Sequence, residues 1–187
     1  MSSTQMQLVS SSQLESCVHD FRHAMGEARN LLTYTDDEAL RKRRSPTSWS
    51  ALECVVHLNL ATNAMLPGIR QAVEAAQPGS DDQSTYRMDL PGRLLAWSLE
   101  PPAFIKVKAP QLTQPLECAG PEPVLHEFEE LHSQLIELLQ ASAGKAIDQQ
   151  KMKSPFANMH YNAYSAFRII AAHDRRHLWQ AHKALGR

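Results

Sequence analysis

Residues 166–184 read AFRIIAAHDRRHLWQAHKA, a stretch that combines an apolar stripe with two histidines four residues apart. On a helical wheel Arg168 and Arg175 fall on one side, which we take as the side that faces solvent. His173 lies about 150° from them, on the side of the small and apolar residues. Those residues are Ala166, Ile169, Ile170, Ala181 and Ala184. The pattern predicts a helix over roughly residues 158–185, closed by a glycine, in which His173 and His177 point inward.

Three earlier segments also carry helical signals. Residues 12–34 repeat apolar side chains at alternating spacings of three and four, which is typical of an amphipathic helix. A second helix is expected to begin at Ser50, because Ser50 and Glu53 have the spacing of a capping box, and to end near Gln77. A third helix is expected over residues 121–144, which open with two prolines and end with a glycine.

The connection between the second and third helices is long and rich in proline. GRLLAWSLE, residues 92–100, is consistent with a short helix, and IKVKA, residues 105–109, alternates as a short strand does. A connection of this length is a crossover rather than a hairpin. The chain is therefore predicted to form an all-α four-helix bundle with a long crossover between helices two and three. We expect a single domain over residues 1–187, with residues 1–11 as a flexible N-terminus.

Composition and charge argue against several classes of protein. The chain has 19 Lys and Arg residues against 20 Asp and Glu residues, so its net charge of −1 offers no field that would hold nucleic acid or an acidic membrane. Its 3 cysteines are widely spaced and form no C-x-x-C pair, which favours a reducing compartment. The sequence shows neither a signal peptide nor the roughly 20 consecutive apolar residues of a membrane span. We therefore expect a cytoplasmic protein without a nucleic-acid or membrane partner.

The inward histidine pair requires something that satisfies two desolvated imidazole rings. At this spacing the rings of His173 and His177 would lie together in an apolar stripe without partners for their nitrogens, which is unfavourable. A metal ion that bridges the two rings, as in helical zinc sites, would satisfy them. A third ligand can come from His57 in the second helix or from His132 in the third. If the second and fourth helices run antiparallel, His57 reaches the level of the pair. The other histidines are expected on polar faces or at helix ends: His19, His23, His126, His160 and His182.

Two separated motifs together suggest a family. WSALECVVHL, residues 49–58, followed by HDRRHLWQ, residues 173–180, resembles the DinB/YfiT-like superfamily of metalloenzymes. The stretch PPAFIKVKAPQLTQP, residues 101–115, is similar to the long crossover of one of its subfamilies. The resemblance extends over nearly the whole chain, from about residue 14 to residue 185.

The resemblance implies a specific site and a set of activities. It makes His57, His173 and His177 a metal triad, leaves His132 outside the ligand set, and makes helices two and three roughly parallel. The metal in this superfamily is commonly zinc or nickel. Characterised branches include bacillithiol transferases and mycothiol-dependent isomerases, and many members have no assigned reaction.

Three neutral imidazoles leave a divalent ion with open coordination positions, which is typical of a catalytic site. Such an ion could activate water for hydrolysis, or a low-molecular-weight thiol for transfer to a small electrophile. Glu53, one turn before His57, and Gln180, three residues after His177, are the candidates for a proton acceptor or an orienting group. Helix capping also explains Glu53, and simple burial also explains Gln180.

The run RKRR at residues 41–44 offers a second functional hypothesis. Arg43 and Arg44 could hold an anionic thiol cofactor or a substrate carboxylate, because a guanidinium group matches a carboxylate geometrically. A solvated loop is the simpler interpretation of such a run. Trp49 and Trp97 could wall a pocket, although core packing also explains Trp49.

Three functions remain open at this point. The first is a metal-dependent thiol S-transferase or hydrolase with a small-molecule substrate, in which thiol transfer ranks first because it needs no protein base beyond the ion. The second is a non-catalytic metal-binding or stress-response module on the same fold. The third is a purely structural bundle, which the inward histidines disfavour. A homodimer is also expected, because an exposed bundle face commonly supports one.

Overall fold

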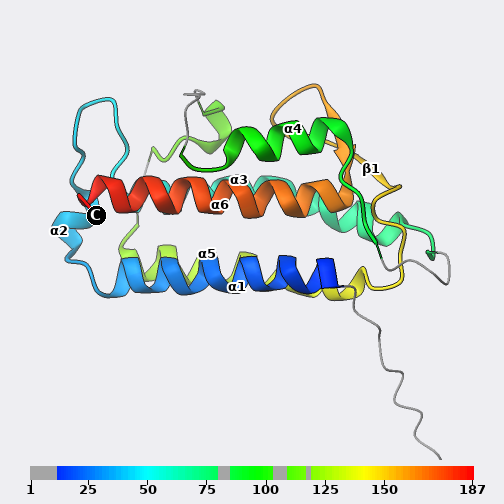
Figure 1. Ribbon diagram of the computed structural model, residues 1–187. Coiled ribbons are helices and arrows are strands. Elements are labelled where there is room, and N and C mark those ends of the chain that lie inside the picture. Colours follow the sequence, from blue (N-terminus) through cyan, green and yellow to red (C-terminus); the bar gives the residue numbers. More distant parts are fainter. Residues whose placement is uncertain (1–11, 80–84, 103–108, 117–118) are drawn as a thin grey trace, which may run out of the picture.

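The computed structural model describes residues 12–79, 85–102, 109–116 and 119–187. Its main elements are four long helices (Figure 1). They are α1 (Ser12–Thr33), α3 (Ala51–Ala75), α5 (Pro121–Ala141) and α6 (Ala163–Ala184). The predicted all-α four-helix bundle is confirmed. The expected flexible N-terminus at residues 1–11 and most of the IKVKA segment lie outside the described residues.

Helices α3 and α5 run parallel to each other. Near their starts, Asn59 Nδ2 donates a hydrogen bond to the Val124 carbonyl oxygen at 2.9 Å. Farther along both helices, Arg70 donates to Gln134 at 3.2 Å. A parallel pair needs a connection that travels the length of the bundle, so the long crossover between these two helices is confirmed as well.

Helices α1 and α6 form the second parallel pair, which runs opposite to the first. Asp20 pairs with Arg168 at 3.3 Å, and Glu27 contacts His182 at 3.2 Å, so the contacts advance together along both helices. Helices α1 and α5 are antiparallel, because Phe21 contacts His132 while Arg29, later in α1, contacts Glu129, earlier in α5. Since α5 is parallel to α3, α3 and α6 are antiparallel, which is the arrangement that brings His57 toward the histidine pair of α6.

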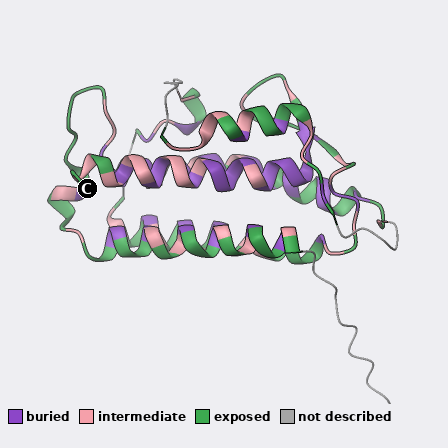
Figure 2. Cartoon of the chain, viewed as in Figure 1, coloured by how far each residue is buried: buried purple, intermediate pink, exposed green. Residues whose placement is uncertain are grey.

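Apolar side chains of the four long helices fill two clusters along the bundle, while the outer faces are exposed (Figure 2). Fully buried members include Phe21, Leu52, Leu58, Ile69, Phe128, Leu135 and Phe167. This is the burial that the amphipathic stripes require. Among helices in the described ranges, none combines the length and the apolarity that a bilayer crossing demands.

The start of α3 follows the predicted capping box. The Ser50 amide donates to Glu53 Oε2 at 2.8 Å, and the Glu53 amide donates to Ser50 Oγ at 3.2 Å. The polar connection before it contains one unexpected element, the short helix α2 (Asp37–Arg41), which Asp36 caps. The predicted start of the second long helix is therefore confirmed, whereas the short helix α2 was not predicted.

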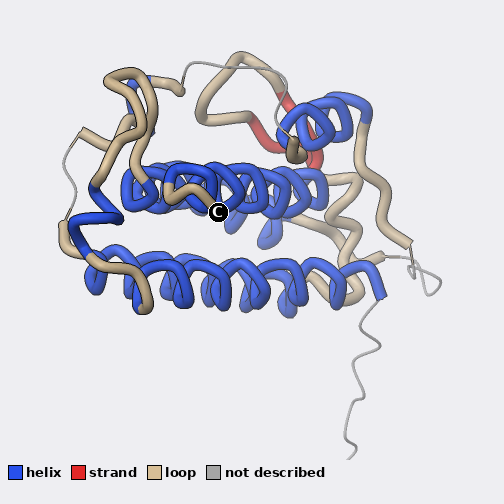
Figure 3. Tube along the Cα trace, turned by 60° about the vertical axis from the view of Figure 1, so that its left-hand side comes forward, coloured by secondary structure: helices blue, strands red, loops and turns tan. Residues whose placement is uncertain are grey.

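The last helix begins later than predicted. Residues expected to start it near 158 instead form strand β2 (His160–Asn162), which pairs antiparallel with β1 (Lys151–Lys153). Asn162 then caps α6, because its side chain accepts a hydrogen bond from the Ser165 amide at 2.8 Å. The two strands lie beside α4, the short helix of the crossover (Figure 3).

The crossover packs against the bundle at two places. Helix α4 (Leu90–Leu99) confirms the short helix expected near residues 92–100 and lies along α6 (Figure 1). The two helices approach so closely that a Cβ atom added to Gly92 would lie 2.3 Å from Ser165 Cβ. Farther along, the 3₁₀ turn η1 (Gln111–Thr113) packs against α3. The crossover therefore covers the α3–α6 side of the bundle.

Candidate metal centre

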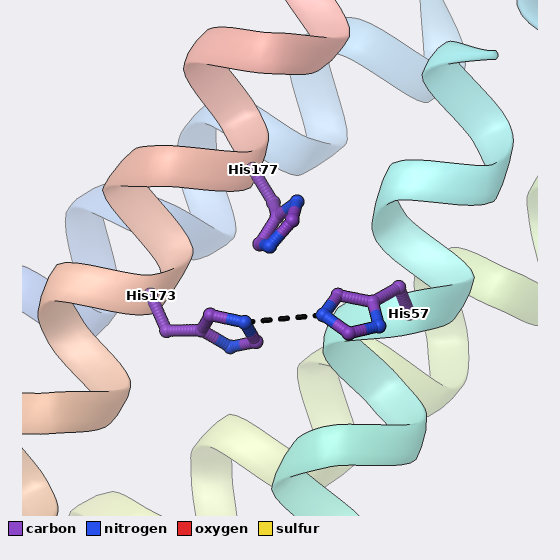
Figure 4. A group of neighbouring side chains, drawn as sticks. All are labelled: His57, His173 and His177. Atoms are coloured by element: carbon purple, nitrogen blue, oxygen red, sulfur yellow. Dashed lines mark hydrogen bonds between the residues drawn. The ribbon is translucent and has the colours of Figure 1, made fainter. Parts of the chain in front are cut away.

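Three imidazole rings meet between α3 and α6 (Figure 4). His57 projects from the second turn of α3, and His173 and His177 project from successive turns of α6. Their ring centroids are 4.5–4.9 Å apart, and one nitrogen from each ring lies within 4.8 Å of the others. Within the described ranges, no other group of three His, Cys, Asp or Glu residues converges in this way.

The orientation of His57 is set by the crossover. His57 Nδ1 lies 2.7 Å from the Thr113 carbonyl oxygen. A carbonyl oxygen only accepts, so Nδ1 carries the proton and donates it. The neutral ring then has its lone pair on Nε2, and this nitrogen faces His173 Nε2 at 3.1 Å. A backbone carbonyl that fixes the tautomer in this way is a common support of metal-ligating histidines.

The three residues fit a divalent metal ion. Two nitrogens bound to one tetrahedral zinc ion at about 2.05 Å stand roughly 3.3 Å apart, close to the His57–His173 separation. His177 Nδ1 is buried and has no hydrogen-bond partner among the described residues, although a buried ring nitrogen normally has one. Neutral imidazole is a donor for zinc, nickel, copper and iron. An ion held by three such rings would keep a coordination position open.

Burial holds all three rings in their neutral form. It lowers the pKa of His57, against a smaller opposite effect of the Thr113 hydrogen bond. The pKa of His173 falls to about 3, first through burial and then through repulsion from His57 and Arg176. The pKa of His177 is also well below its usual value, again chiefly because of burial. No ring must therefore release a proton at neutral pH before it can bind a metal.

Trp49 covers the ring cluster. Its indole ring lies 4.7 Å from the His57 ring and 5.7 Å from the His177 ring, measured between centroids. Because it contacts two of the three rings, Trp49 forms a wall of the ring cluster, and its side chain is half-buried. Trp97, by contrast, is 72% exposed on α4.

Glu53 and Arg43 lie together at the start of α3. Glu53 accepts hydrogen bonds from the Ser50 amide and from Arg43 Nε, both at 2.8 Å, and a second Arg43 nitrogen contacts its other oxygen. Although burial acts to raise the pKa of Glu53, the bonds from Arg43 and Ser50 outweigh it and lower that pKa. The Glu53 carboxylate is therefore ionised and engaged on both oxygens.

The other two predicted residues lie near α6. Arg44 Nη1 donates to the Lys183 carbonyl oxygen at 2.7 Å and so caps the end of that helix. Gln180 lies one turn after His177, and its side chain acts through a hydrogen bond to raise the pKa of His177 against the effect of burial. Of the two, Gln180 is the one that the structure brings next to the imidazole cluster.

His132 lies apart from the three rings and has its own partner. Its Nδ1 lies 2.8 Å from the Phe128 carbonyl oxygen, and its Nε2 lies 3.0 Å from Asp174 Oδ2. Both side chains are buried in the core. Asp174 carries no sequence signal for this role, because its partner lies 42 positions earlier in the chain. His19 and His23 are exposed, as expected.

The side of α6 that carries Arg168 and Arg175 is less exposed than predicted. Arg168 and Arg175 were expected to face solvent, but both are partly buried against α1 and the crossover. Arg168 pairs with Asp20 at 3.3 Å, and Arg175 Nε donates to Glu100 Oε2 at 3.0 Å. The helical periodicity correctly predicts that both arginines lie opposite the inward stripe of α6. It cannot show that acidic residues of α1 and of the crossover pair with them.

Comparisons with known proteins identify a related fold and a family. The solved structure of YfiT from Bacillus subtilis, described as a probable metal-dependent hydrolase with an unusual four-helix bundle topology, superposes with a TM-score of 0.63 at 14% identity. The match covers 97% of this chain and 91% of YfiT. No curated protein sequence matches this chain. The family model of the DinB superfamily matches residues 20–181, and the chain therefore belongs to the DinB superfamily.

Proposed function

We propose that this protein is a metal-dependent enzyme that binds one divalent ion through His57, His173 and His177 and acts on a small-molecule substrate. The observation that carries the proposal is the convergence of three neutral rings, one of which has its Nε2 lone pair directed at the others by the Thr113 carbonyl. The shared fold with YfiT, a probable metal-dependent hydrolase, supports it. We expect zinc or nickel, because both accept three imidazole ligands.

When bound, such an ion supplies Lewis acidity that favours loss of a proton from water or from a thiol. The protein's own residues supply orientation and shielding. Thr113 holds the His57 ring, Trp49 covers it, and Gln180 is placed to hydrogen-bond the His177 ring or a substrate group. These contacts hold the rings of His57 and His177 in place.

We rank transfer of a low-molecular-weight thiol to a small electrophile above hydrolysis. A thiol bound at the site needs no separate protein base. Glu53, the acidic candidate one turn from His57, would have to break its bonds to Ser50 and Arg43 before accepting a proton. Hydrolysis is the second candidate, and the likeness to YfiT favours it. If an anionic thiol is held by Arg43 or Arg44, that arginine must exchange its present partner for the thiol.

Two further properties belong to the proposal. A cytoplasmic location agrees with the free thiols of Cys17 and Cys54, both of which are buried. A homodimer agrees with an exposed apolar stripe on α4, formed by Leu90, Leu94 and Trp97.

The test begins with metal analysis of protein purified without a polyhistidine tag, which should find about one divalent ion per chain. The loaded protein is then incubated with several cellular thiols and a chromogenic electrophile, alongside ester and amide substrates. Thiol-dependent turnover supports the transferase, and metal-dependent turnover without a thiol supports the hydrolase. A bound ion with no turnover would favour a non-catalytic metal-binding or stress-response module. Full metal occupancy in a His173→Ala, His177→Ala double variant would reject the ligand assignment.

A further inference from the structure

The three residues between the two histidines of α6 reach three different parts of the protein. Asp174 contacts His132 on α5. Arg175 pairs with Glu100 at the end of α4 and with Asp20 on α1. Arg176 Nη1 donates to the Ser98 carbonyl oxygen of α4 at 3.1 Å. The segment that carries the candidate ligands is therefore held from several directions by polar contacts.

Asp174 is the member of this segment that enters the core. Its side chain is 1% exposed and that of His132 is 0% exposed. Both nitrogens of His132 face acceptors, namely the Phe128 carbonyl oxygen at 2.8 Å and Asp174 Oδ2 at 3.0 Å. One proton must therefore lie between Nε2 and the carboxylate, whichever atom it is formally assigned to. The two side chains are therefore joined by a buried hydrogen bond between α5 and α6.

Stability alone is a poor explanation for this pair. Burying two ionisable groups carries a large desolvation penalty, and apolar side chains of similar volume are often equally stable or more so. Asp174 Oδ1 is buried and has no hydrogen-bond partner within the described part of the chain, which adds to that penalty. An apolar contact, however, has no preferred direction. The hydrogen bond ties one atom of α6 to one atom of α5, and so restricts the rotation of α6 about its axis.

We propose that Asp174 and His132 are positioning residues that fix the rotation of α6, so that His173 and His177 present their rings to His57. This inference rests on the proposed metal site. On a helix Asp174 lies about 100° from His173 and about 60° from His177 around the axis. The direction in which Asp174 points therefore fixes the directions in which both histidines point. An atom about 6 Å from the helix axis moves about 1 Å for a rotation of about 10°. Metal–ligand distances tolerate only about 0.2 Å.

The experiment compares three variants with the wild-type protein. Asp174→Asn removes the charge and keeps the size. A His132→Leu, Asp174→Leu double variant replaces the pair with an apolar contact, which preserves packing where the single change might not. Glu27→Gln is the matched control, because Glu27 also pairs with a histidine of α6, His182 at 3.2 Å, but outside the segment between the ligands.

Each protein is measured in three ways. Zn²⁺ affinity is measured by competition with a chromogenic chelator, the Co²⁺ absorption spectrum reports coordination geometry, and the melting temperature of the metal-free protein reports folding. We expect Zn²⁺ binding to weaken by about 10- to 100-fold in Asp174→Asn and in the leucine pair, with a shifted Co²⁺ spectrum. The leucine pair should still melt close to the metal-free wild type. Glu27→Gln should bind both metals as the wild type does.

The outcomes separate this inference from the proposed function. Wild-type affinity and an unchanged Co²⁺ spectrum in the leucine pair would overturn the positioning role and leave the metal site intact. A wild-type protein that binds no ion, or binds it equally well after His173→Ala and His177→Ala, would overturn both. Weaker metal binding in a leucine pair that folds normally supports positioning, because a merely structural role would affect melting rather than coordination.

Discussion

Replacing His177 with alanine should remove the response of the protein to metal while changing the metal-free protein little. In the metal-free state His177→Ala leaves a cavity, which destabilises a core. It also removes a buried ring nitrogen that lacks a partner among the described residues, and an unsatisfied buried polar atom costs about 1–3 kcal/mol. These two effects have opposite signs, so we expect the metal-free variant to lie within about 2 kcal/mol of the metal-free wild type.

The metal-bound state gives the larger signal. An ion that binds only the folded protein and is present at about 1,000 times its dissociation constant stabilises that protein by about 4 kcal/mol. For a chain of this size, each kcal/mol raises the melting temperature by about 2–4 °C, so chelation should lower that of the wild type by about 8–16 °C. Helix content should persist, because four amphipathic helices still bury their apolar stripes without the ion. In His177→Ala the shift should shrink to about 2 °C or less, since two ligands hold the ion much more weakly.

The assay is thermal denaturation followed by circular dichroism, with and without a chelator, on untagged protein. His23→Ala on the exposed face of α1 is the control and should keep the full shift. The ligand assignment would be refuted by a His177→Ala variant that still gains the full shift with metal. A metal-free wild type that is wholly unfolded would instead make the ion a structural one.

Three further predictions address pH, packing and the site wall. Burial lowers the pKa of His57, His173 and His177, so between about pH 6.5 and 5 the unfolded chain binds more protons than the folded one. The free energy of unfolding of the metal-free protein, measured by urea titration, should therefore fall with pH by up to about 1.4 kcal/mol per pH unit for each ring. A free energy of unfolding that does not change over this range would contradict the prediction. Gly92→Ala should destabilise the fold by about 1–3 kcal/mol in chemical denaturation, because the added methyl group collides with Ser165; unchanged stability would mean that α4 sits farther from α6. Ni²⁺ should quench the fluorescence of Trp49, because its ring is 4.7 Å from that of His57. Trp49→Phe should reduce the total quenching, and quenching of the same size in the variant would place the ion away from Trp49.

The features that the sequence predicted well are encoded locally. The amphipathic stripes of α1, α3, α5 and α6 need only neighbouring residues, and the Ser50–Glu53 capping box spans three positions. The inward direction of His173 and His177 follows from the same local geometry. Bringing His57 to them needed one long-range assumption, antiparallel packing of α3 on α6, and the structure has that packing.

The features that were missed depend on partners far away in the chain. The late start of α6 follows from pairing of β2 with β1, two strands of 3 residues each, too short to give a clear alternating pattern. Arg43 and Arg44 were identified as positive charges, but a run of charges does not show that one would pair with Glu53 and the other with the end of α6. The Thr113 carbonyl could not be predicted, since every residue has such a group and only tertiary structure shows which one meets His57.

The crossover has a role at the site because of the bundle's topology. A helix of 25 residues, such as α3, is about 37 Å long, and a parallel neighbour requires the chain to return over that whole distance before α5 begins. The return path runs along α6 as α4 and then reaches α3 at η1, beside His57. The Thr113 carbonyl, which holds the ring of the candidate ligand His57, thus lies on a connection rather than on a bundle helix. Because connections tolerate sequence change better than cores do, the environment of the rings can vary through the crossover while the three histidines stay on the rigid helices α3 and α6.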